Sequence, residues 1–557
     1  MNREMLHNGE SGVVLVVCMI ILLMLSLIGI ASITTSNSEM QVAGNEMRNT
    51  GAFYAADAGL EKATSEIVSS YENTGAPPNP LPAALETMNN YRYFYCVNDL
   101  GPATNKVLTY GSYNGLYAFV KSFKVISQGV DNDLSSGVEI RLRVEDALIP
   151  VYQFAVFYEN MLEIGPGPNM TISGRVHSNN DTYLESESNL FMDQLTCGGN
   201  IYYGTAPGNG ETPGTGNILI RDGNGNYQNM RNSDGTYLDA TDPDWVNNSI
   251  SRWGSTVEDR NHGVTDLYMP IAAVDSPTDM IDRASGSPES YENRAGLKFV
   301  DGQALYLQMD GTWLDVTGAL AGNGTISFST FYDEREGQNV LSLDLNIAQL
   351  ATSGYFPTNG IIYSSRPEVS GNITAIRLTN GSQLPSGLTI ATNNPLYTLG
   401  NFNSVNKRPV SLMADAITIL SNNWNDANSG LGMGARTATG TTVNAAYITG
   451  NTETGSPGHG YCGGLENLPR FLENWNGVTF TWRGSAVSLW YSRQAASSWS
   501  MAYYSPPIRD WGFDTSFLSI ANLPPGTPMV NVIVKTGWNH KVIDDFSHFG
   551  SAYQEGS

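Results

Sequence analysis

One unbroken apolar run near the start of the chain constrains its fold more than any other feature. The run covers residues 13–33, with the sequence VVLVVCMIILLMLSLIGIASI. About 20 apolar residues in a helix span the hydrocarbon core of a bilayer. We therefore predict a transmembrane helix over residues 13–33, which holds everything after it at a membrane.

The segment before this run fits a signal anchor better than an ordinary signal peptide. A signal peptide has a basic start, an apolar core of about 7–15 residues and a small-residue cleavage site. Residues 1–12 contain one Arg and two Glu, and the apolar run is longer than such a core. Ile30-Ala31-Ser32 leaves signal-peptide cleavage as an alternative.

The helical pattern continues beyond the apolar run. Apolar residues recur at helical spacing as far as Ile67, no proline precedes Pro77, and residues 75–78 (GAPP) form a stop signal. We predict one helix over about residues 13–71, on the order of 90 Å long at about 1.5 Å per residue. Residues 34–75 would form an amphipathic stalk whose small residues permit close helix packing.

The stretch GVVLVVCMIILLMLSLIGIASITTSNSEMQVAGNEMRNTGAFYAADAGLEKA resembles the N-terminal region of PilX-type minor pilins of type IV pili. The glycine before the apolar run, MQVAGNEMRN and AFYAADAGLE carry this resemblance, over about residues 9–70. It implies a leader peptide over residues 1–12 and a prepilin peptidase cut between Gly12 and Val13. It also implies that the mature helix packs in a filament core, for which we select Val17, Gly29, Gly44, Gly51, Ala55 and Gly59.

One position departs from the pattern of major pilins, which carry Glu at the fifth mature position. Val17 occupies that position here. PilX-like proteins and some type II secretion pseudopilins also lack this Glu, so the departure favours a minor or tip subunit. An uncleaved single-pass anchor with a helical stalk is the alternative.

The resemblance also implies partners and a location. The partners are major and minor pilins, the inner-membrane pilus assembly platform and prepilin peptidase. Before assembly the chain would span the bacterial inner membrane once, with its C-terminal region periplasmic or extracellular. After assembly it would be part of the pilus.

Composition limits the rest of the chain. With 557 residues it is too long for one compact core, so we expect two or more domains. Charged residues make up only 15%, well below the roughly 25% of ordinary soluble domains, as in turn-rich β structure on an outer surface. The net charge of −24 argues against nucleic acid as a partner and against a peripheral anchor on anionic lipid.

The expected fold class is α+β, mainly β. Residues 76–158 predict a pilin-like head, with a short helix at 81–90 and strands at 116–126 and 138–144 in a small antiparallel sheet against the stalk. Residues 159–474 predict a partly solenoidal β domain, because short apolar strands with Asn-rich corners can stack coil upon coil. No repeat of fixed length is visible, and a β-sandwich is the alternative.

Smaller features of the β-rich part are also predicted. Residues 205–300 have the composition of surface insertions, and helical interruptions are expected at 339–350 and 464–474. Residues 475–557 form a C-terminal β region. There VTFTW and AVSLWY are expected to pair across a turn at Arg483-Gly484-Ser485, and residues 529–535 form the last strand.

No catalytic constellation is found, so we predict a structural protein, not an enzyme. GxSxG, HExxH, P-loop and GxGxxG motifs are absent from the sequence. His177 is interpreted as a turn histidine bonded to backbone. The segment Asp333-Glu334-Arg335-Glu336 is interpreted as a solvated loop with an internal ion pair, in preference to a glycosidase acid/base pair. His459 and Cys462 lie close together but lack a positioned base.

No metal or cofactor is predicted, although one weak calcium candidate stands out. Asp222, Asn224 and Asn226 alternate as in a calcium loop, yet Tyr227 and Ser233 stand where an EF-hand needs Gly and Glu. A calcium site of another type stays open. Three cysteines follow the apolar run, namely Cys96, Cys197 and Cys462. Zinc is not expected, because they lack CxxC spacing. One disulfide among them would leave one free thiol.

These features together predict a pilin-like minor subunit of a type IV pilus or related pseudopilus. It would take part in filament assembly and present an interaction domain at the tip, with a surface glycan as a candidate ligand. The alternative is a membrane-anchored β-helix surface protein that binds or cleaves polysaccharide. The aromatics of residues 475–511 are interpreted as buried core residues in preference to a carbohydrate-binding face.

Overall fold

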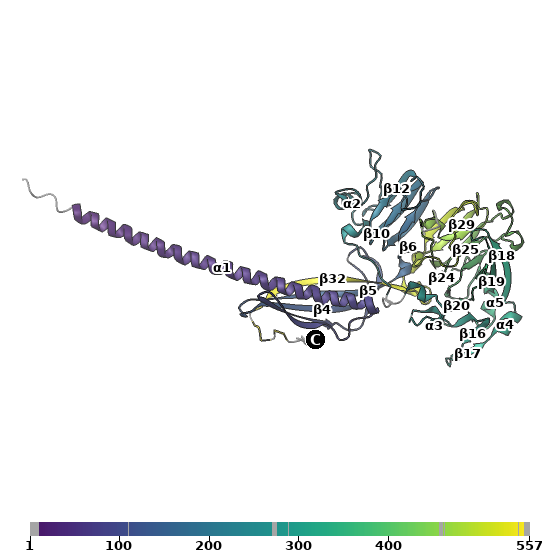
Figure 1. The fold of residues 1–557 in the computed structure, drawn as a ribbon, viewed down its shortest axis with the longest axis horizontal. Coiled ribbons are helices and arrows are strands. Elements are labelled where there is room, and N and C mark those ends of the chain that lie inside the picture. Colours follow the sequence, from purple (N-terminus) through teal and green to yellow (C-terminus); the bar gives the residue numbers. More distant parts are fainter. Residues whose placement is uncertain are drawn as a thin grey trace, which may run out of the picture.

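A single long helix projects from a β-rich body (Figure 1). The computed structural model describes residues 10–109, 111–269, 276–287, 289–455, 461, 463–543, 545–547 and 549–550. The helix, α1 (Glu10–Thr74), ends where Gly75 adopts a φ of +66°, a conformation that terminates helices. The predicted continuous helix and the α+β, mainly β class are confirmed.

A six-stranded antiparallel sheet, the head sheet, packs against the second half of α1. Its spatial order is β1-β2-β4-β5-β32, with β3 beside β4. The antiparallel sheet expected against the stalk is therefore present. Its strands are β1 (Ala83–Met88), β2 (Tyr91–Asp99), β3 (Thr104–Val107), β4 (Tyr117–Asp131), β5 (Gly137–Pro150) and β32 (Met529–Val542).

The helix predicted at residues 81–90 is wrong, because this segment is the edge strand β1. Its side chains alternate between partly buried and exposed, which is the period of a strand. Asn89 adopts a φ of +56° in the tight turn that folds β1 back onto β2. Ala83 then pairs with Cys96, and Met88 with Tyr91.

The last strand of the chain returns to the head. β32 pairs with β5 from Met529 opposite Pro150 to Val542 opposite Val138. The chain between these two strands therefore leaves the head sheet and comes back to the same place. The large β-rich part is an insertion between two neighbouring strands of the head, not a domain that follows it.

The inserted part is a β-solenoid, and its first layer is one long sheet. Between two antiparallel ends, every neighbouring pair of strands is parallel. In spatial order these strands are β12 (Thr215–Arg221), β10 (Ser186–Cys197), β8 (Met170–Ser178), β6 (Val156–Tyr158), β30 (Ala486–Ser488), β27 (Ala446–Thr449), β24 (Val410–Ala414), β22 (Leu388–Thr392), β20 (Ile361–Ser365) and β15 (Leu297–Val300).

A column of buried apolar side chains runs through this layer, one from each successive strand. Each is at most 4% exposed, so the coils share one continuous core. Neighbours in the column come from uneven positions in the sequence, which is why no fixed repeat is visible. The column contains Leu297, Ile362, Ile390, Leu412, Tyr447, Ala486, Val156, Val176 and Leu195.

The chain enters this solenoid in the middle and forms two arms. The first arm (residues 156–221) runs from β6 through β8 and β10 to β12. The chain then crosses to the far end, and the second arm (residues 297–513) runs from β15 back to β30. The arms meet where Ala486 pairs with Val156, a seam between strands distant in sequence.

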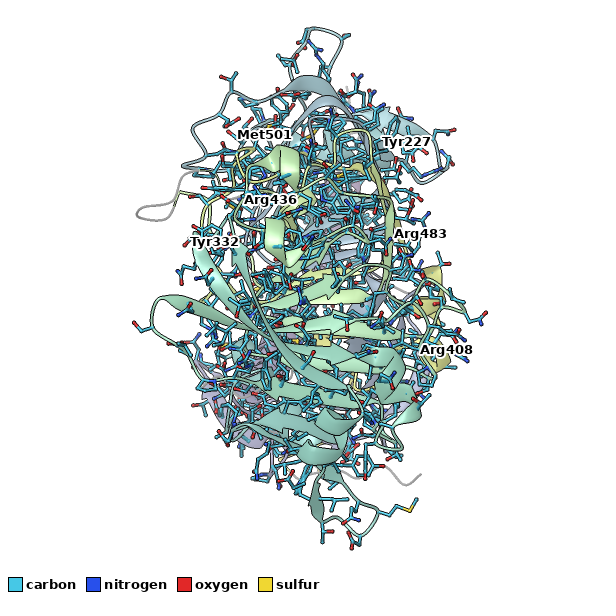
Figure 2. All side chains as sticks on the ribbon, turned by 90° about the vertical axis from the view of Figure 1, so that its right-hand side faces the viewer. Tyr227, Tyr332, Arg408, Arg436, Arg483 and Met501 are labelled. Carbon is cyan, nitrogen blue, oxygen red and sulfur yellow. The ribbon has the colours of Figure 1, made fainter. Side chains whose placement is uncertain are left out.

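Two further sets of strands complete the coils. In Figure 2 the strands of the second arm lie as successive rungs. The second layer of the first arm contains β7 (Leu162–Ile164), β9 (Thr182–Leu184) and β11 (Ile201–Tyr203). That of the second arm contains β18 (Ile326–Asp333), β19 (Gln338–Asn346), β21 (Asn372–Thr379), β23 (Leu396–Leu399), β25 (Ile417–Leu420) and β28 (Pro469–Phe471). A third layer contains β26 (Thr441–Asn444), β29 (Thr479–Gly484) and β31 (Ile508–Phe513).

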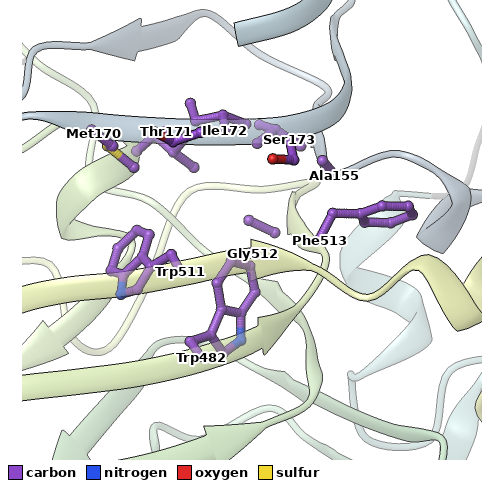
Figure 3. A pocket seen from close by; sticks show the side chains of 12 residues that line it. Ala155, Met170, Thr171, Ile172, Ser173, Trp482, Trp511, Gly512 and Phe513 are labelled. Carbon is purple, nitrogen blue, oxygen red and sulfur yellow. The ribbon is translucent and has the colours of Figure 1, made fainter. Parts of the chain in front are cut away.

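The third layer crosses the seam between the arms. β31 of the second arm lies against β8 of the first. Trp482 and Trp511 face Met170 and Ile172 across an apolar cavity of about 20 Å³ (Figure 3). Such a cavity has room for about one water molecule, so the arms are closely packed here.

Three of the smaller predictions are wrong. Residues 339–350 are mostly β19, whose Val340, Leu343 and Leu345 are buried against β18 and β21; only α5 (Ile347–Thr352) is helical. Residues 464–474 form a 3₁₀ turn (Leu465–Asn467) and β28. β29 and β30 do not pair with each other, because the bend between them passes the chain from the third layer to the first.

Both ends of the solenoid are capped. Residues 205–300 include β12, β13 (Tyr227–Asn229), α2 (Trp245–Trp253), β14 (Val257–Glu258) and α3 (Tyr291–Arg294). The expected surface insertion thus also supplies core, since Trp245 and Trp253 are buried at the end of the first arm. The other end carries β16 (Gln303–Leu307), β17 (Trp313–Asp315) and α4 (Thr317–Gly322).

Candidate functional site

The first half of α1 is exposed in the described chain, and its residues 13–33 form an apolar surface. Residues 12–47 are all exposed, and Leu22 and Leu23 are each 63% exposed. The helix is long and apolar enough to cross a membrane, judged by length and composition. A soluble protein does not keep so large an apolar surface in water, so lipid or other apolar helices must cover it.

The second half of α1 is buried against the protein's own head sheet. Ala52, Ala55, Ala56, Ala63 and Ile67 have no exposed surface. Small side chains bring the helix backbone close to the sheet. At Gly129 of β4, an added Cβ would lie 2.1 Å from the carbonyl oxygen of Ala52. The sheet residues in this core include Tyr93, Tyr95, Phe123, Val125 and Val144.

The residues selected for filament packing divide between these halves. A Cβ on Gly51 would collide with the Tyr91 ring, and one on Gly59 with Ser127 Oγ, while Ala55 is fully buried. These three residues therefore pack inside the subunit, because their own head sheet covers them. Filament contact stays a prediction for the three exposed residues Val17, Gly29 and Gly44. The two residues at the expected cleavage site, Gly12 and Val13, are exposed as well.

Polar contacts fasten the helix to the head as well. Lys535 Nζ of β32 lies 2.7 Å from Glu61 Oε1, and the Tyr95 hydroxyl donates a 2.7 Å hydrogen bond to Glu66. At the end of α1, Tyr71 adjoins the buried carboxyl group of Asp146. Burial raises the pKa of Asp146 to about 6. The buried half of α1 is therefore a structural part of the head.

A serine, a histidine and an aspartate meet at the capped end of the first arm. Ser249 Oγ lies 2.6 Å from His262 Nε2, and His262 Nδ1 lies 2.8 Å from Asp259 Oδ1. This is the connectivity of a catalytic triad. However, Ser249 and Asp259 are fully buried, and Ser249 donates to the Val246 carbonyl within α2. With no access for a substrate, the trio serves to fasten α2 to the following turn.

Sequence reasoning missed this trio because nothing local marks it. Ser249 lies on a helix without the GxSxG turn that presents a nucleophile. Asp259 and His262 look like an ordinary capping pair, which they also are. Only the docking of α2 onto the turn brings the three together.

The histidine selected from the sequence is a core residue. His177 lies within β8, not in a turn, and has no exposed surface. Its Nδ1 lies 2.8 Å from Thr196 Oγ1 and its Nε2 3.0 Å from Asn179 Oδ1. Burial lowers the pKa of His177 to about 4, so the ring is neutral at pH 7.

The calcium candidate is a hairpin turn between β12 and β13. Asp222 Oδ1 accepts hydrogen bonds from the backbone amides of Asn224 and Asn226, each 2.9 Å long. Asp222 Oδ2 accepts a 2.8 Å hydrogen bond from Gln228. The carboxylate oxygens thus face the turn itself. In the part of the chain that the structure describes, no group of three or more His, Cys, Asp or Glu is placed to hold a metal ion.

The charged segment of residues 333–336 is not a solvated loop. Asp333 and Arg335 are 3% and 7% exposed, and Asp333 accepts a 2.8 Å hydrogen bond from the Tyr397 hydroxyl. Glu336 pairs with Arg470 at 2.8 Å, so the segment has an ion-pair partner outside it. Ser497 N also donates to Glu336, because the loop that follows Arg493 covers this hairpin end.

The cysteine and aromatic predictions have separate outcomes. Cys96 of the head and Cys197 of β10 are both buried and are not bonded to each other. Cys462 and His459 lie outside the described residues. Among the tryptophans and tyrosines of residues 475–511, four are buried, namely Trp475, Trp482, Trp490 and Tyr504. The other four are partly exposed: Tyr491, Trp499, Tyr503 and Trp511.

Comparison with known proteins bears on the N-terminal segment. Residues 11–61 match the family model described as PilX N-terminal. The N-terminal segment of this chain is therefore similar to the PilX N-terminal region. This match confirms the resemblance inferred from the apolar run and the AFYAADAGLE stretch. The PilX N-terminal region comprises the whole exposed half of α1 and the start of the buried half.

Other comparisons are weaker. No curated protein sequence matches the chain. Among solved structures, the competence-associated pilin ComZ from Thermus thermophilus aligns with 13% sequence identity and a TM-score of 0.28. That alignment covers 89% of this chain and 98% of the other. At this TM-score the two structures superpose only weakly.

Proposed function

We propose that this chain is a pilin-like minor subunit of a type IV pilus or of a related pseudopilus. The observation that carries the proposal is the exposed apolar half of α1 within the PilX N-terminal region. Such a helix can exchange lipid for the apolar helices of neighbouring subunits without rearranging the head. Its partners would be major and minor pilins, delivered by the inner-membrane assembly platform.

The arrangement of the molecule supports a role in presentation as well as assembly. The solenoid lies at the end of the head away from the exposed half of α1 (Figure 1). A subunit whose helix enters a filament would carry the solenoid outside it, as a tip interaction domain. In this proposal the protein is structural: prepilin peptidase cuts after Gly12, and the new N-terminus at Val13 leaves the inner membrane for the pilus.

N-terminal mass spectrometry of protein from sheared filaments tests the proposal. We expect mature protein that begins at Val13, and we expect Gly12→Lys to abolish both the cut and piliation. Gly286→Lys is the matched control, because Gly286 is an exposed glycine in the chain segment between the two arms, with open space where a Cβ would lie. Unchanged processing and piliation in Gly12→Lys, with no protein starting at Val13, would contradict the proposal.

A membrane-anchored solenoid protein that binds or cleaves polysaccharide is the second candidate. The stack of parallel strands favours it, since such solenoids present long surfaces for extended ligands. It predicts an uncleaved N-terminus and protein that stays in the membrane fraction. Loss of glycan turnover on mutation of two or three carboxylates that line a groove of the solenoid would support cleavage over binding.

A further inference from the structure

The strongest unassigned feature is a cleft between the two arms of the solenoid. The first layer is continuous there, through the pairing of β6 with β30. The second layer is interrupted there. Its sheet in the first arm ends at β7, and its sheet in the second arm ends at β28. This interruption leaves a cleft of about 900 Å³, lined by residues of both arms.

One wall of the cleft is rich in carboxylates. Glu185, Glu187 and Glu466 line it, and Glu466 is only 3% exposed. Glu466 accepts a 2.8 Å hydrogen bond from the Tyr461 hydroxyl, which fixes its carboxylate. Burial and neighbouring carboxylates raise the pKa of Glu185. A ligand that brings hydroxyl donors or positive charge would relieve this repulsion.

Positive charge within the protein does little to balance this wall. Arg509 is the one basic side chain among the described residues that line the cleft. Its Nη2 donates a 3.1 Å hydrogen bond to the backbone carbonyl of Glu466, not to a carboxylate. Glu185 accepts a hydrogen bond from the backbone amide of Gly214, and Glu466 accepts one from that of Gly165. These two carboxylates keep part of their acceptor capacity for a ligand, and Glu187 is exposed to the cleft.

Beside these carboxylates the cleft is lined by aromatic residues that are held in place. Trp499 is partly exposed, and its Nε1 donates a 2.8 Å hydrogen bond to the Tyr504 hydroxyl. Tyr461 meets the Trp499 ring edge-on, with centroids 5.3 Å apart. Tyr504 in turn donates to Asn467, another lining residue. Met501, also lining the cleft, is 57% exposed and lies on the side away from Arg408 and Arg483 in Figure 2.

These carboxylates and aromatic residues have the chemistry that recognises sugar rings. The C–H face of a pyranose packs on a fixed aromatic ring, while its hydroxyl and amino groups donate to carboxylates and amides. An ammonium group also gains from an adjacent aromatic face. Uronic or sialic acids would bring negative charge to the carboxylate wall and be repelled.

We propose that this cleft binds a glycan chain without negative charge, with preference for amino sugars that bear free ammonium groups. Trp499 supplies the stacking face, and Glu185, Glu187 and Glu466 accept from the sugar. The proposal gives a site and a ligand class to the tip interaction proposed above, but it does not depend on assembly into a filament.

Titration calorimetry on the full chain in detergent micelles tests this proposal. The probes are hexamers of glucosamine, N-acetylglucosamine and galacturonate, with hexalysine as a charge-matched peptide. We expect the glucosamine hexamer to bind, the N-acetylated hexamer to bind at least 10-fold more weakly, and the galacturonate hexamer not to bind. Hexalysine binding as tight as that of the glucosamine hexamer would overturn the glycan class.

Two variants with matched controls locate the site. Trp499→Ala and Glu187→Gln should each weaken the glucosamine hexamer at least 10-fold, and Glu187 is exposed enough for its substitution to leave the fold intact. Trp313→Ala and Glu368→Gln, at partly exposed or exposed positions outside the cleft, should change nothing. No binding by the unaltered protein, or binding indifferent to Glu187→Gln, would overturn the proposal.

A third variant separates this proposal from the pilin function. Gly12→Lys should keep full affinity for the glucosamine hexamer even where it abolishes processing. If Gly12→Lys is processed normally while the hexamer still binds, the pilin function fails and the cleft proposal stands. If processing is abolished while the unaltered protein binds no hexamer, the cleft proposal fails alone.

Discussion

The two halves of α1 have similar backbones and opposite surroundings. The first half exposes nearly every side chain, including Leu23 at 63%, whereas the second half buries Ala55, Ala56 and Ile67 completely. Large apolar residues make up most of residues 13–33 in the first half, and the second half uses small ones that let a sheet come close. The first half therefore needs an environment outside the subunit, and the second already has its partner.

This difference separates assembly from folding within one helix. A change in the exposed half should alter where the protein resides and leave the head intact. A change in the buried half should unfold the head, whatever membrane or filament surrounds the first half. The following four substitutions test this separation, from the largest expected effect to the smallest.

Ala56→Asp should cause the largest effect, because it buries an unpaired carboxylate beneath the head sheet. We expect a loss of roughly 3–5 kcal/mol in the free energy of unfolding of the head. Thermal unfolding and limited proteolysis of the full chain in detergent would measure it. Ala43→Asp, in the exposed half, is the matched control and should unfold like the unaltered protein. Equal stability of the two variants would break the comparison.

Leu23→Lys should act on the other side of the comparison. A lysine at the centre of a membrane helix costs about 3 kcal/mol of insertion free energy. The membrane-bound fraction of the protein should fall, while the thermal unfolding of the head in detergent stays the same. Asn37→Lys, outside the apolar run, should alter neither measurement. An unfolded head in Leu23→Lys would show that the exposed half is needed for folding after all.

The pH dependence of head stability should report the carboxyl group of Asp146. Its pKa of about 6 in the folded protein lies above the ordinary value of 3.8. Its contribution to stability is thus complete below about pH 4 and is lost as the pH rises through 6. Between pH 4 and pH 8 the loss should reach about 2–3 kcal/mol.

Asp146→Asn should remove most of this pH dependence, as thermal unfolding at pH 4 and pH 8 would show. Asp133→Asn, in the exposed β4–β5 turn, should keep it. If Asp146→Asn loses as much stability as the unaltered protein over this range, another group carries the dependence.

Gly129→Ala should have the smallest effect of the four and sharpen the comparison most. The new methyl group would lie 2.1 Å from the Ala52 carbonyl, so the helix or β4 must shift. We expect a loss of about 1–3 kcal/mol in the free energy of unfolding, measured by thermal unfolding in detergent. Gly286→Ala, with open space around it, should be neutral. A neutral Gly129→Ala would show that close approach is not what fixes the buried half.

Local features were predictable from the sequence wherever the physical cause is local. The helical spacing of apolar residues and the absence of proline before Pro77 locate α1. Apolar runs between Gly and Asn turns locate β20, β22 and β24. The prediction failed at β1 and β19, where a strand exists because a partner strand lies beside it. Helix propensity alone does not reveal such a partner.

The candidate site divides in the same way. The apolar run and AFYAADAGLE showed the resemblance to PilX N-terminal regions from the sequence, and the family model matches the same segment. The cleft between the arms was not predictable, because Glu185 and Trp499 come to the same cleft only through the seam between β6 and β30. The buried charges of residues 333–336 were misread for a similar reason, since their partner Arg470 is distant in the chain.

The sequence by itself determined a long helix with an apolar first part, followed by many short strands. Only the tertiary structure decided which half of that helix is covered, that β32 returns to β5, and that the solenoid is built from its middle. The physical reason is that helical hydrogen bonds join near neighbours in the chain. Strand pairing offers the same backbone groups to many partners, and the choice among them depends on the core that the whole chain buries.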